Sequence, residues 1–361
     1  MKIADQPVHG GNTVKAGPIL GRRFHPRAVP LLAGALVSAA ALALAGCSAG
    51  GTAASGTEGV ALSAATTGPA SLAAAQSGKY QVLTLNDKRD LTFNQLLGIN
   101  NEGQIAGYFG SGAAGHPNKG FGLRPPYAQA DFGGENFPGA AQTQITGLND
   151  TGISVGFFST MNAATVTNDP NFGFWRENGR YHAVSYPTRK NSKPPVNQLL
   201  GVNNTGTAVG FYNDGAGNAH GYAYNLQTRR FKLVTVPGAT SLTAAAINNK
   251  GAVAGFFTNA KGTVDAFLKL HSGKIFTLMV PGASATQAFG VNDRYEVVGT
   301  YTTGTGNNAA VHGFTWMNGR FGTVNFPLAS STTVNGVNNE GDIVGFYTDA
   351  KGNSDGFVGL P

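Results

Sequence analysis

Alternating apolar and polar residues, interrupted by Gly, Asn and Pro, recur along the chain from residue 79 to the C-terminus. One recurring segment has the form LLGINNEGQIAGYF, and a second ends in Pro, as in FGFWRENGRYHAVSYP from Phe172. The first segment begins at intervals of 44 to 54 residues, at Leu96, Ile145, Leu199, Ala244, Ala288 and Val334. Period-two alternation between turn residues is typical of short β-strands. Each repeat unit therefore predicts four strands, as in one blade of a β-propeller.

The two ends of the repeat region complement each other. KYQVLTLN, from Lys79, has the pattern of a fourth strand, and DGFVGLP, from Asp355, has the pattern of a third strand. Pairing between them would complete a sixth unit and leave no exposed sheet edge. We therefore expect an all-β fold over residues 79–361, a six-bladed β-propeller of four-stranded blades with the first strand of each unit innermost. An open solenoid is the alternative, and it would not need complementary ends.

Every unit has an Asn at the end of its first strand, and a Gly follows three residues later except in the fifth unit, which has Tyr295. These residues are Asn100, Asn149, Asn203, Asn248, Asn292 and Asn338. An Asn side chain can bond its own backbone in a tight turn, and Gly adopts positive φ without steric cost. Tyr295 implies a different turn or a strain of about 1 kcal/mol. Because residues needed once per unit serve the fold, we expect function where the units differ.

The third strands supply a further pattern, since His220 and His312 begin two of them as HGY and HGF. Together with the G-[ILV]-N-[ND]-x-G turn, this pattern resembles the HAF-type bacterial extracellular repeats over about 280 residues. The resemblance implies an exported protein with propeller-like repeats, and it implies no catalytic motif. We interpret both histidines as part of the strand starts rather than as ligands or bases.

The N-terminal segment differs from the repeats in charge and composition. Residues 1–47 hold five basic residues and one acid, which is more than half of the formal net charge of +7. An uncharged run then leads to LAGC, which resembles the bacterial lipobox, and its Cys47 is the only cysteine of the chain. We expect residues 1–46 to be a lipoprotein signal peptide, Cys47 to be lipidated, and residues 47–78, rich in Ala, Gly, Ser and Thr, to be a flexible tether. An ordinary signal peptide with an incidental thiol is the alternative.

These features predict location and partners. Ser48 follows the cysteine where the inner-membrane retention signal of lipoproteins has Asp, so we expect an outer-membrane lipoprotein that faces the periplasm or the cell surface. We do not expect nucleic acid as a partner, because most of the positive charge lies in the segment that we expect to be removed. We expect a monomer without disulfides, metal or cofactor.

One strand position is polar in every unit. It is occupied by Gln95, Gln144, Gln198, Thr243, Gln287 and Thr333. With the first strands innermost, these side chains are expected at the mouth of the central channel. Amide and hydroxyl groups there suit sugar hydroxyls or a peptide backbone, and hydration of a narrow channel is the alternative.

Three insertions break the regularity of the first two units, at residues 110–120, 159–171 and 188–197. In the expected topology they rise over one sector of the channel mouth. Their basic residues are His116, Lys119, Arg189, Lys190 and Lys193. An acidic polysaccharide or an acidic protein would match this charge, and tolerated variation in loop length is the alternative.

Enzyme motifs are absent from the sequence, including G-x-S-x-G, H-E-x-x-H and the P-loop. We therefore expect a binding or scaffolding module for an extracytoplasmic glycan, polyanion or protein. The alternative is a carbohydrate-active hydrolase or lyase that uses carboxylates at the channel mouth. A pair of acids within one concave pocket would favour that alternative.

Overall fold

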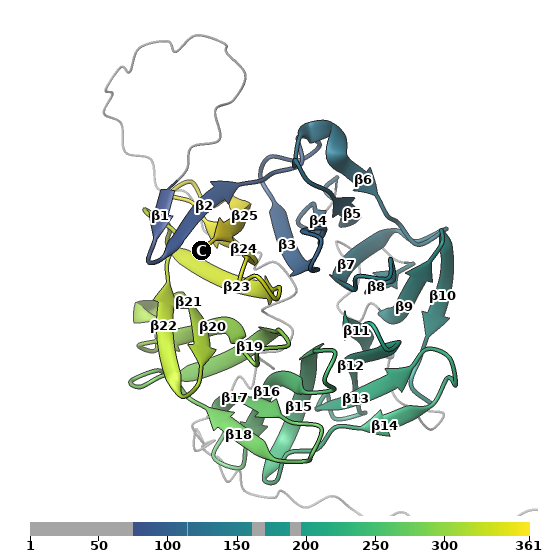
Figure 1. Ribbon diagram of the computed structural model, residues 1–361, viewed down its shortest axis with the longest axis vertical. Coiled ribbons are helices and arrows are strands. Elements are labelled where there is room, and N and C mark those ends of the chain that lie inside the picture. The colour runs from purple at the N-terminus through teal and green to yellow at the C-terminus, as the bar shows by residue number, and fades with distance from the viewer. Residues whose placement is uncertain (1–74, 114, 161–169, 188–195) are drawn as a thin grey trace, which may run out of the picture. The chain divides into compact units, whose positions relative to one another are not determined.

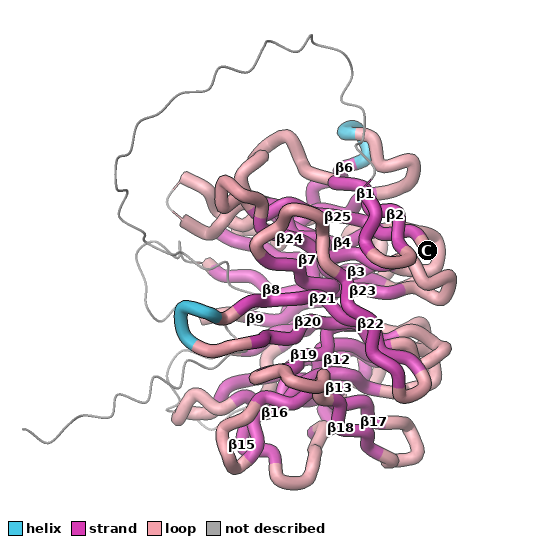
Figure 2. Tube along the Cα trace, turned by 90° about the vertical axis from the view of Figure 1, so that its left-hand side faces the viewer, coloured by secondary structure: helices cyan, strands magenta, loops and turns pink. Residues whose placement is uncertain are grey.

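The computed structural model describes residues 75–361 except 114, 161–169 and 188–195. In this part the chain forms 25 β-strands and two short 3-10 helices, η1 (Gln129–Asp131) and η3 (Gly306–Asn308). Figure 1 shows the strands in groups around a centre, and Figure 2 shows the same strands from the side. The prediction of an all-β fold is confirmed.

The strands form antiparallel groups of four, which we number as units in the order of their first strands. Unit 1 contains β3 (Asn94–Ile99), β4 (Ile105–Phe109), β5 (Lys119–Leu123) and β6 (Phe132–Gly134). Unit 2 contains β7 (Gln142–Leu148), β8 (Ser154–Ser159), β9 (Phe172–Glu177) and β10 (Arg180–Val184). Unit 3 contains β11 (Asn197–Val202), β12 (Thr207–Asn213), β13 (Ala219–Asn225) and β14 (Phe231–Leu233).

The remaining units have the same order of strands. Unit 4 contains β15 (Ala239–Ile247), β16 (Val253–Asn259), β17 (Val264–Lys269) and β18 (Ile275–Leu278). Unit 5 contains β19 (Ala285–Val291), β20 (Val297–Thr303), β21 (Ala310–Met317) and β22 (Arg320–Val324). Unit 6 contains β23 (Ser331–Val337), β24 (Ile343–Thr348), β25 (Ser354–Leu360) and, from the other end of the domain, β2 (Tyr80–Thr84).

The terminal strands pair as the sequence predicts. β2 is antiparallel to β25, with Gln81 opposite Leu360 and Thr84 opposite Phe357. Tyr80 and Val82 of β2 are buried in the core of unit 6, so the early strand completes a hydrophobic cluster as well as a sheet. A short strand before it, β1 (Ala75–Ser77), pairs with β2 and lies within the segment that the sequence suggested as a tether.

Units 4, 5 and 6 are not separate sheets, because they form one 13-stranded sheet together with β1. Single parallel bridges join the third strand of one unit to the first strand of the next, at Val264 opposite Ala285 and at Val311 opposite Ser331. Each such connection involves one residue pair. The architecture is therefore propeller-like, with units joined at their corners, and it is not a closed barrel.

A ring of hydrogen bonds connects all six units at the ends of their first strands. It is formed by the six turn residues, here called the Asn ring: Asn100, Asn149, Asn203, Asn248, Asn292 and Asn338. Each Nδ2 donates to the backbone oxygen of the ring residue in the next unit, at 2.9 to 3.4 Å, and each Oδ1 accepts the backbone N–H four residues further along its own turn. One side chain thus shapes its turn, as predicted, and also joins its unit to the next.

The residues that follow the Asn ring form a second set of links. They are Asn101, Asp150, Asn204, Asn249, Asp293 and Asn339. The backbone N–H of each donates to the Oδ1 of its counterpart in the next unit, at 2.8 to 2.9 Å, and the last link returns from unit 6 to unit 1. Two layers of side-chain hydrogen bonds therefore close the same end of the ring.

The turn at Tyr295 keeps the backbone of the other units. Its φ is 61°, and the glycines at the equivalent positions have φ from 73° to 91°. Of the two alternatives that the sequence allows, a different turn or a strained one, the structure therefore has the strained one. The Lys250 ammonium lies 5.0 Å from the centre of the Tyr295 ring, a contact that offsets part of this strain.

The glycines of the first and second strands serve two different contacts. A Cβ on Gly107 of β4 would lie 2.9 Å from the Phe121 ring in the same unit, so this Gly makes room within its own sheet. The second-strand glycines therefore make room within their own unit and do not serve the approach of neighbouring units. The units approach at the first strands instead, where a Cβ on Gly98 would lie 3.0 Å from the Cα atom of Gly147.

Candidate functional site

The polar position that the sequence predicts at the channel mouth is buried in all six units. The exposed fractions are 3% for Gln95, 6% for Gln144, 8% for Gln198, 1% for Thr243, 9% for Gln287 and 7% for Thr333. We call these residues the Gln/Thr layer. They lie inside the molecule, and their role as ligand-binding residues stays a prediction. Arg189, Lys190, Lys193 and Cys47 lie outside the described residues.

Apolar side chains fill the centre of the ring next to the Gln/Thr layer. Leu97, Leu200, Ala245 and Phe289 belong to one buried cluster, although they come from units 1, 3, 4 and 5. Residues of these units can meet only at the ring centre. Each is the residue at which the first strand shifts register against the second, so the bulges supply the central apolar contacts.

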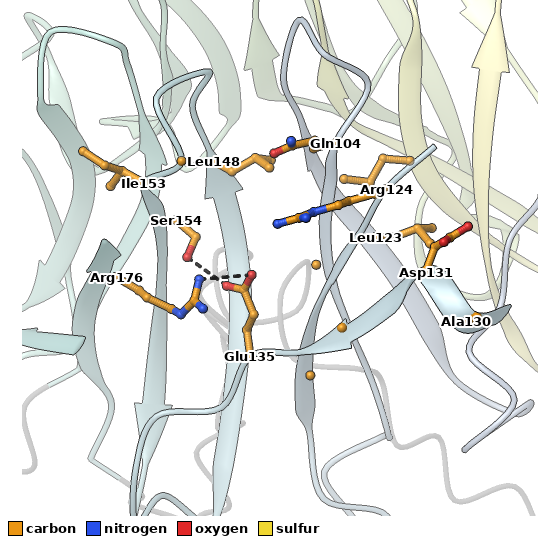
Figure 3. A pocket seen from close by; sticks show the side chains of 15 residues that line it. Gln104, Leu123, Arg124, Ala130, Asp131, Glu135, Leu148, Ile153, Ser154 and Arg176 are labelled. Atoms are coloured by element: carbon orange, nitrogen blue, oxygen red, sulfur yellow. Dashed lines mark hydrogen bonds and ion pairs between the residues drawn. The ribbon is translucent and has the colours of Figure 1, made fainter. Parts of the chain in front are cut away.

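A pocket of about 430 Å³ lies between units 1 and 2. Figure 3 shows side chains from both units around it. Polar and charged groups come from Gln104, Arg124, Asp131, Glu135, Ser154 and Arg176. Leu148 and Ile153 add apolar surface, and Gly122, Gly133 and Gly134 form part of the lining. Sequence reasoning missed this site.

Two missing side chains explain why the pocket exists. Gly122 of β5 pairs with Gly133 of β6, and the equivalent pair in unit 2 is Trp175 and His182. The two rings stack at 4.0 Å between their centres, and Trp175 packs against the core between units 2 and 3. Unit 1 has hydrogen atoms where unit 2 has two aromatic rings. The space that these rings fill in unit 2 is therefore open between units 1 and 2.

An enlarged connection between the third and fourth strands forms one wall. Residues 124–131 connect β5 to β6, whereas only Asn178 and Gly179 connect β9 to β10. The connection is held in place because the Tyr127 hydroxyl donates to the backbone oxygen of Gly103 at 2.8 Å. It contributes Arg124 and Asp131 to the pocket.

The charged groups of the pocket differ in how they are paired. Glu135 lies 3.4 Å from Arg176, and the Ser154 hydroxyl donates to Glu135 at 3.0 Å. Arg176 also lies over the Tyr181 ring, 5.7 Å from its centre, and its buried Nε has no hydrogen-bond partner among the described residues. Burial raises the pKa of the Tyr181 phenol, which keeps this neighbour neutral at physiological pH.

Arg124 and Asp131 do not pair with each other. Figure 3 shows the Arg124 guanidinium directed into the pocket and the Asp131 carboxylate directed away from it. Asp131 accepts the Ala128 N–H at 2.6 Å, and Arg124 has no ion pair within the part of the chain that the structure describes. The pocket therefore presents hydrogen-bonding groups and one unpaired positive charge rather than two carboxylates that face each other.

Two further features of the described residues bear on the site. No group of three His, Cys, Asp or Glu side chains among them is arranged to hold a metal ion. None of the helices in the described ranges has the length and apolar character needed to cross a membrane.

No family model and no curated protein matches the chain. Among solved structures, a protein of unknown function from Dyadobacter fermentans is 10% identical with a TM-score of 0.51, and the match covers 77% of this chain and 96% of that one. A triple arginine-to-alanine mutant of AofleA from Arthrobotrys oligospora is 12% identical with a TM-score of 0.48, covering 78% and 86%. A mutant of Aleuria aurantia lectin in complex with alpha-methyl-L-fucoside is 11% identical with a TM-score of 0.43, covering 73% and 90%. At these identities the similarity concerns the fold alone.

Proposed function

We propose that the domain is a carbohydrate-binding module and that the pocket between units 1 and 2 holds one sugar residue. The observation that carries the proposal is the exchange of the stacked Trp175 and His182 for Gly122 and Gly133, which opens a pocket at one junction between units. Its volume of about 430 Å³ lies within the ordinary range of small-molecule sites.

The groups around the pocket match the chemistry of a sugar. Sugar hydroxyls both donate and accept hydrogen bonds, and the lining offers acceptor oxygens on Glu135, donors on the two arginines, and both kinds of group on Gln104 and Ser154. Leu148 and Ile153 provide apolar surface for the C–H groups of a sugar ring. Because Glu135 is held by Arg176 and Ser154, its position is fixed before a ligand arrives, which lowers the entropy lost on binding.

The binding test uses a filled pocket and a matched control. A Cβ on Gly122 would lie 2.9 Å from the Glu135 carboxylate, so Gly122→Val fills the pocket and displaces that group. Thr315 has the same strand position in unit 5, and Thr315→Val places the same valine at that position, far from the pocket. On a glycan array followed by calorimetry, we expect Gly122→Val to weaken binding at least tenfold and Thr315→Val to leave it unchanged. Equal binding by Gly122→Val, at unchanged melting temperature, would show that the sugar binds elsewhere.

We further propose that the fold is a six-bladed β-propeller closed by the pairing of its N- and C-terminal strands. The antiparallel pair of β2 and β25 supports it, as do the hydrogen bonds of the Asn ring, which return from unit 6 to unit 1. The HAF-type pattern of the repeats is consistent with it.

The proposal also places the domain outside the cytoplasm, on a lipid anchor at Cys47 followed by the tether. The lipobox-like LAGC sequence supports this placement. Metabolic labelling with palmitate tests it, because Cys47→Ala removes the only thiol in the chain. Loss of label and release from membranes is the expected result, and unchanged labelling would exclude Cys47 as the acceptor.

A further inference from the structure

We infer that the sugar held in this pocket carries a negative charge, a carboxylate or a sulfate, and that the charged group binds Arg124. The inference rests on the proposed function of the pocket and specifies the class of glycan. It depends on the balance of charge inside the pocket, on the position of Arg124, and on what surrounds each of the four charged side chains.

The charges in the lining do not cancel at the centre of the pocket. Arg176 and Glu135 neutralise each other at 3.4 Å. Asp131 is directed away from the pocket and accepts the Ala128 N–H. Gln104 also turns toward a neighbour, since its Nε2 donates to the Glu102 carboxylate at 3.1 Å. The Arg124 guanidinium therefore remains as the uncompensated charge that faces the ligand.

The position of Arg124 depends on the enlarged connection. Arg124 directly follows β5, and its backbone oxygen accepts the Tyr127 N–H at 2.9 Å, in a turn that the Tyr127 hydroxyl attaches to Gly103. In unit 2 the position equivalent to Arg124 is Glu177, which leads into a two-residue turn. An arginine is therefore present at this position in unit 1 and not in unit 2. It lies in the same segment that forms a wall of the pocket.

An anionic oxygen is the group that an unpaired guanidinium binds most strongly. Charge-assisted hydrogen bonds are about twice as strong as neutral ones, and a planar guanidinium can hold a carboxylate or a sulfate through two parallel N–H bonds. A sugar hydroxyl would use the same donors without the charge. The paired Glu135 and Ser154 remain available for the hydroxyl groups of the same sugar.

The test compares acidic polysaccharides with neutral partners that have the same backbone. The pairs are polygalacturonate and its methyl ester, hyaluronan and its carboxyl-reduced form, and κ-carrageenan and its desulfated form. We expect at least one acidic member to bind the full chain at least tenfold more tightly than its partner, with an affinity that falls as salt is added. The first two pairs report a carboxylate and the third a sulfate.

Two variants locate the effect. Both side chains are exposed; Arg124→Gln removes the charge that lines the pocket, and Arg320→Gln removes a charge on β22 of unit 5. We expect Arg124→Gln to abolish the preference for the acidic member and Arg320→Gln to retain it. The inference is overturned if no acidic member is preferred, or if the preference survives Arg124→Gln.

The inference and the proposed function fail in different ways. If neutral glycans bind and Gly122→Val abolishes their binding, the pocket is a sugar site and only the inferred charge is wrong. If Gly122→Val leaves all glycan binding unchanged, the proposed function itself fails.

Discussion

The ring of units contains two buried polar layers, and they differ in how their hydrogen bonds are satisfied. In the Asn ring every Nδ2 and every Oδ1 has a partner. In the Gln/Thr layer, side-chain atoms of Gln144, Gln198, Thr243 and Gln287 are buried without a partner among the described residues. The Asn ring repeats a single interaction in all six units. The Gln/Thr layer is polar in all six units, but no one hydrogen bond recurs in all of them.

In units 1 to 4 the residue opposite the member of the Gln/Thr layer accounts for the difference. In unit 1, Tyr108 pairs with Gln95, and its hydroxyl donates to the Gln95 side chain at 2.8 Å. In units 2, 3 and 4 a Phe occupies the Tyr108 position. A Phe ring fills the same space without a hydroxyl, so the polar atom opposite it is left unpaired.

Unpaired buried polar atoms are expensive, since each costs about 1 to 3 kcal/mol. We therefore expect ordered water molecules in the Gln/Thr layer of units 2 to 5, where they would bond these atoms. The Asn ring should be dry, because its groups already bond one another. Variants that disturb first the closure shared by both layers, and then each layer in turn, test this contrast between a bonded and a hydrated layer.

The largest effect should follow removal of the strands that close unit 6. Deletion of residues 75–86 leaves the Asn ring intact but exposes the edge of β25 and the core cluster that contains Tyr80 and Val82. We expect a loss of several kcal/mol in the free energy of unfolding, together with self-association through the free edge. Denaturant unfolding and light scattering measure both. A monomer as stable as the parent would show that the Asn ring alone closes the fold.

The next largest effect should come from one member of the Asn ring. Asn248→Ala removes the bond to the Asn292 backbone oxygen at 2.9 Å and leaves two turn N–H groups without their acceptor. We expect a loss of about 2 to 4 kcal/mol. Asn259 shapes a similar turn at a half-buried position, and its Nδ2 donates to Asp265 of its own unit at 2.9 Å rather than to another unit's turn, so Asn259→Ala should cost less, about 1 kcal/mol. Equal losses would mean that the inter-unit bond contributes nothing.

Repetition explains why the sequence predicts the closure of the ring but not the pocket. Asn248 and its counterparts recur in every unit, and the terminal segments at Lys79 and Asp355 complete one another, so one sequence displays the rule six times. The pocket results from the absence of side chains at Gly122 and Gly133. In a sequence, a Gly within a strand indicates only a lower β-propensity and does not indicate a pocket. The signal that could have located it was the length of residues 124–131.

The burial of the Gln/Thr layer could not be predicted for a different reason. The alternation of the first strand places these residues toward the ring centre, but burial there depends on Leu97, Leu200, Ala245 and Phe289. These residues lie at β-bulges and come from four different units. A register shift has no clear sequence signal in a single chain, so the packing at the centre appears only in three dimensions.

A smaller effect should follow removal or addition of the hydroxyl group by which Tyr108 of unit 1 differs from the equivalent Phe residues of units 2 to 4. Tyr108→Phe removes the donor to Gln95 and should cost about 1 kcal/mol, because a buried polar atom is left to water. Phe211→Tyr places a hydroxyl opposite Gln198, whose Oε1 is unpaired, and should change the free energy of unfolding by less than Tyr108→Phe does. Denaturant unfolding of both variants checks this order. A loss of several kcal/mol in Phe211→Tyr would indicate a dry and tightly packed layer at that point.

The smallest effect should appear as a pH dependence beside the Asn ring. Burial alone would raise the pKa of Asp293, but hydrogen bonds from Asn339 and Asn249 outweigh it and hold the pKa below its ordinary value. A lowered pKa stabilises the fold above the unfolded value near pH 4, and the contribution disappears as the pH falls through the folded pKa. Asp293→Asn should therefore cost about 1 kcal/mol at pH 7, and the difference from the parent should shrink below about pH 4.

Asp150 supplies the matched control for this last measurement. It accepts the side chains of Asn101 and Asn204 in the same way, but these hydrogen bonds are exposed, whereas those to Asp293 are partly buried, so Asp150→Asn should cost less than Asp293→Asn at pH 7. Unfolding curves at pH 7 and pH 3 for the parent and both variants give the four differences. A cost for Asp293→Asn that is the same at both pH values would mean that the lowered pKa contributes nothing to the stability of the ring.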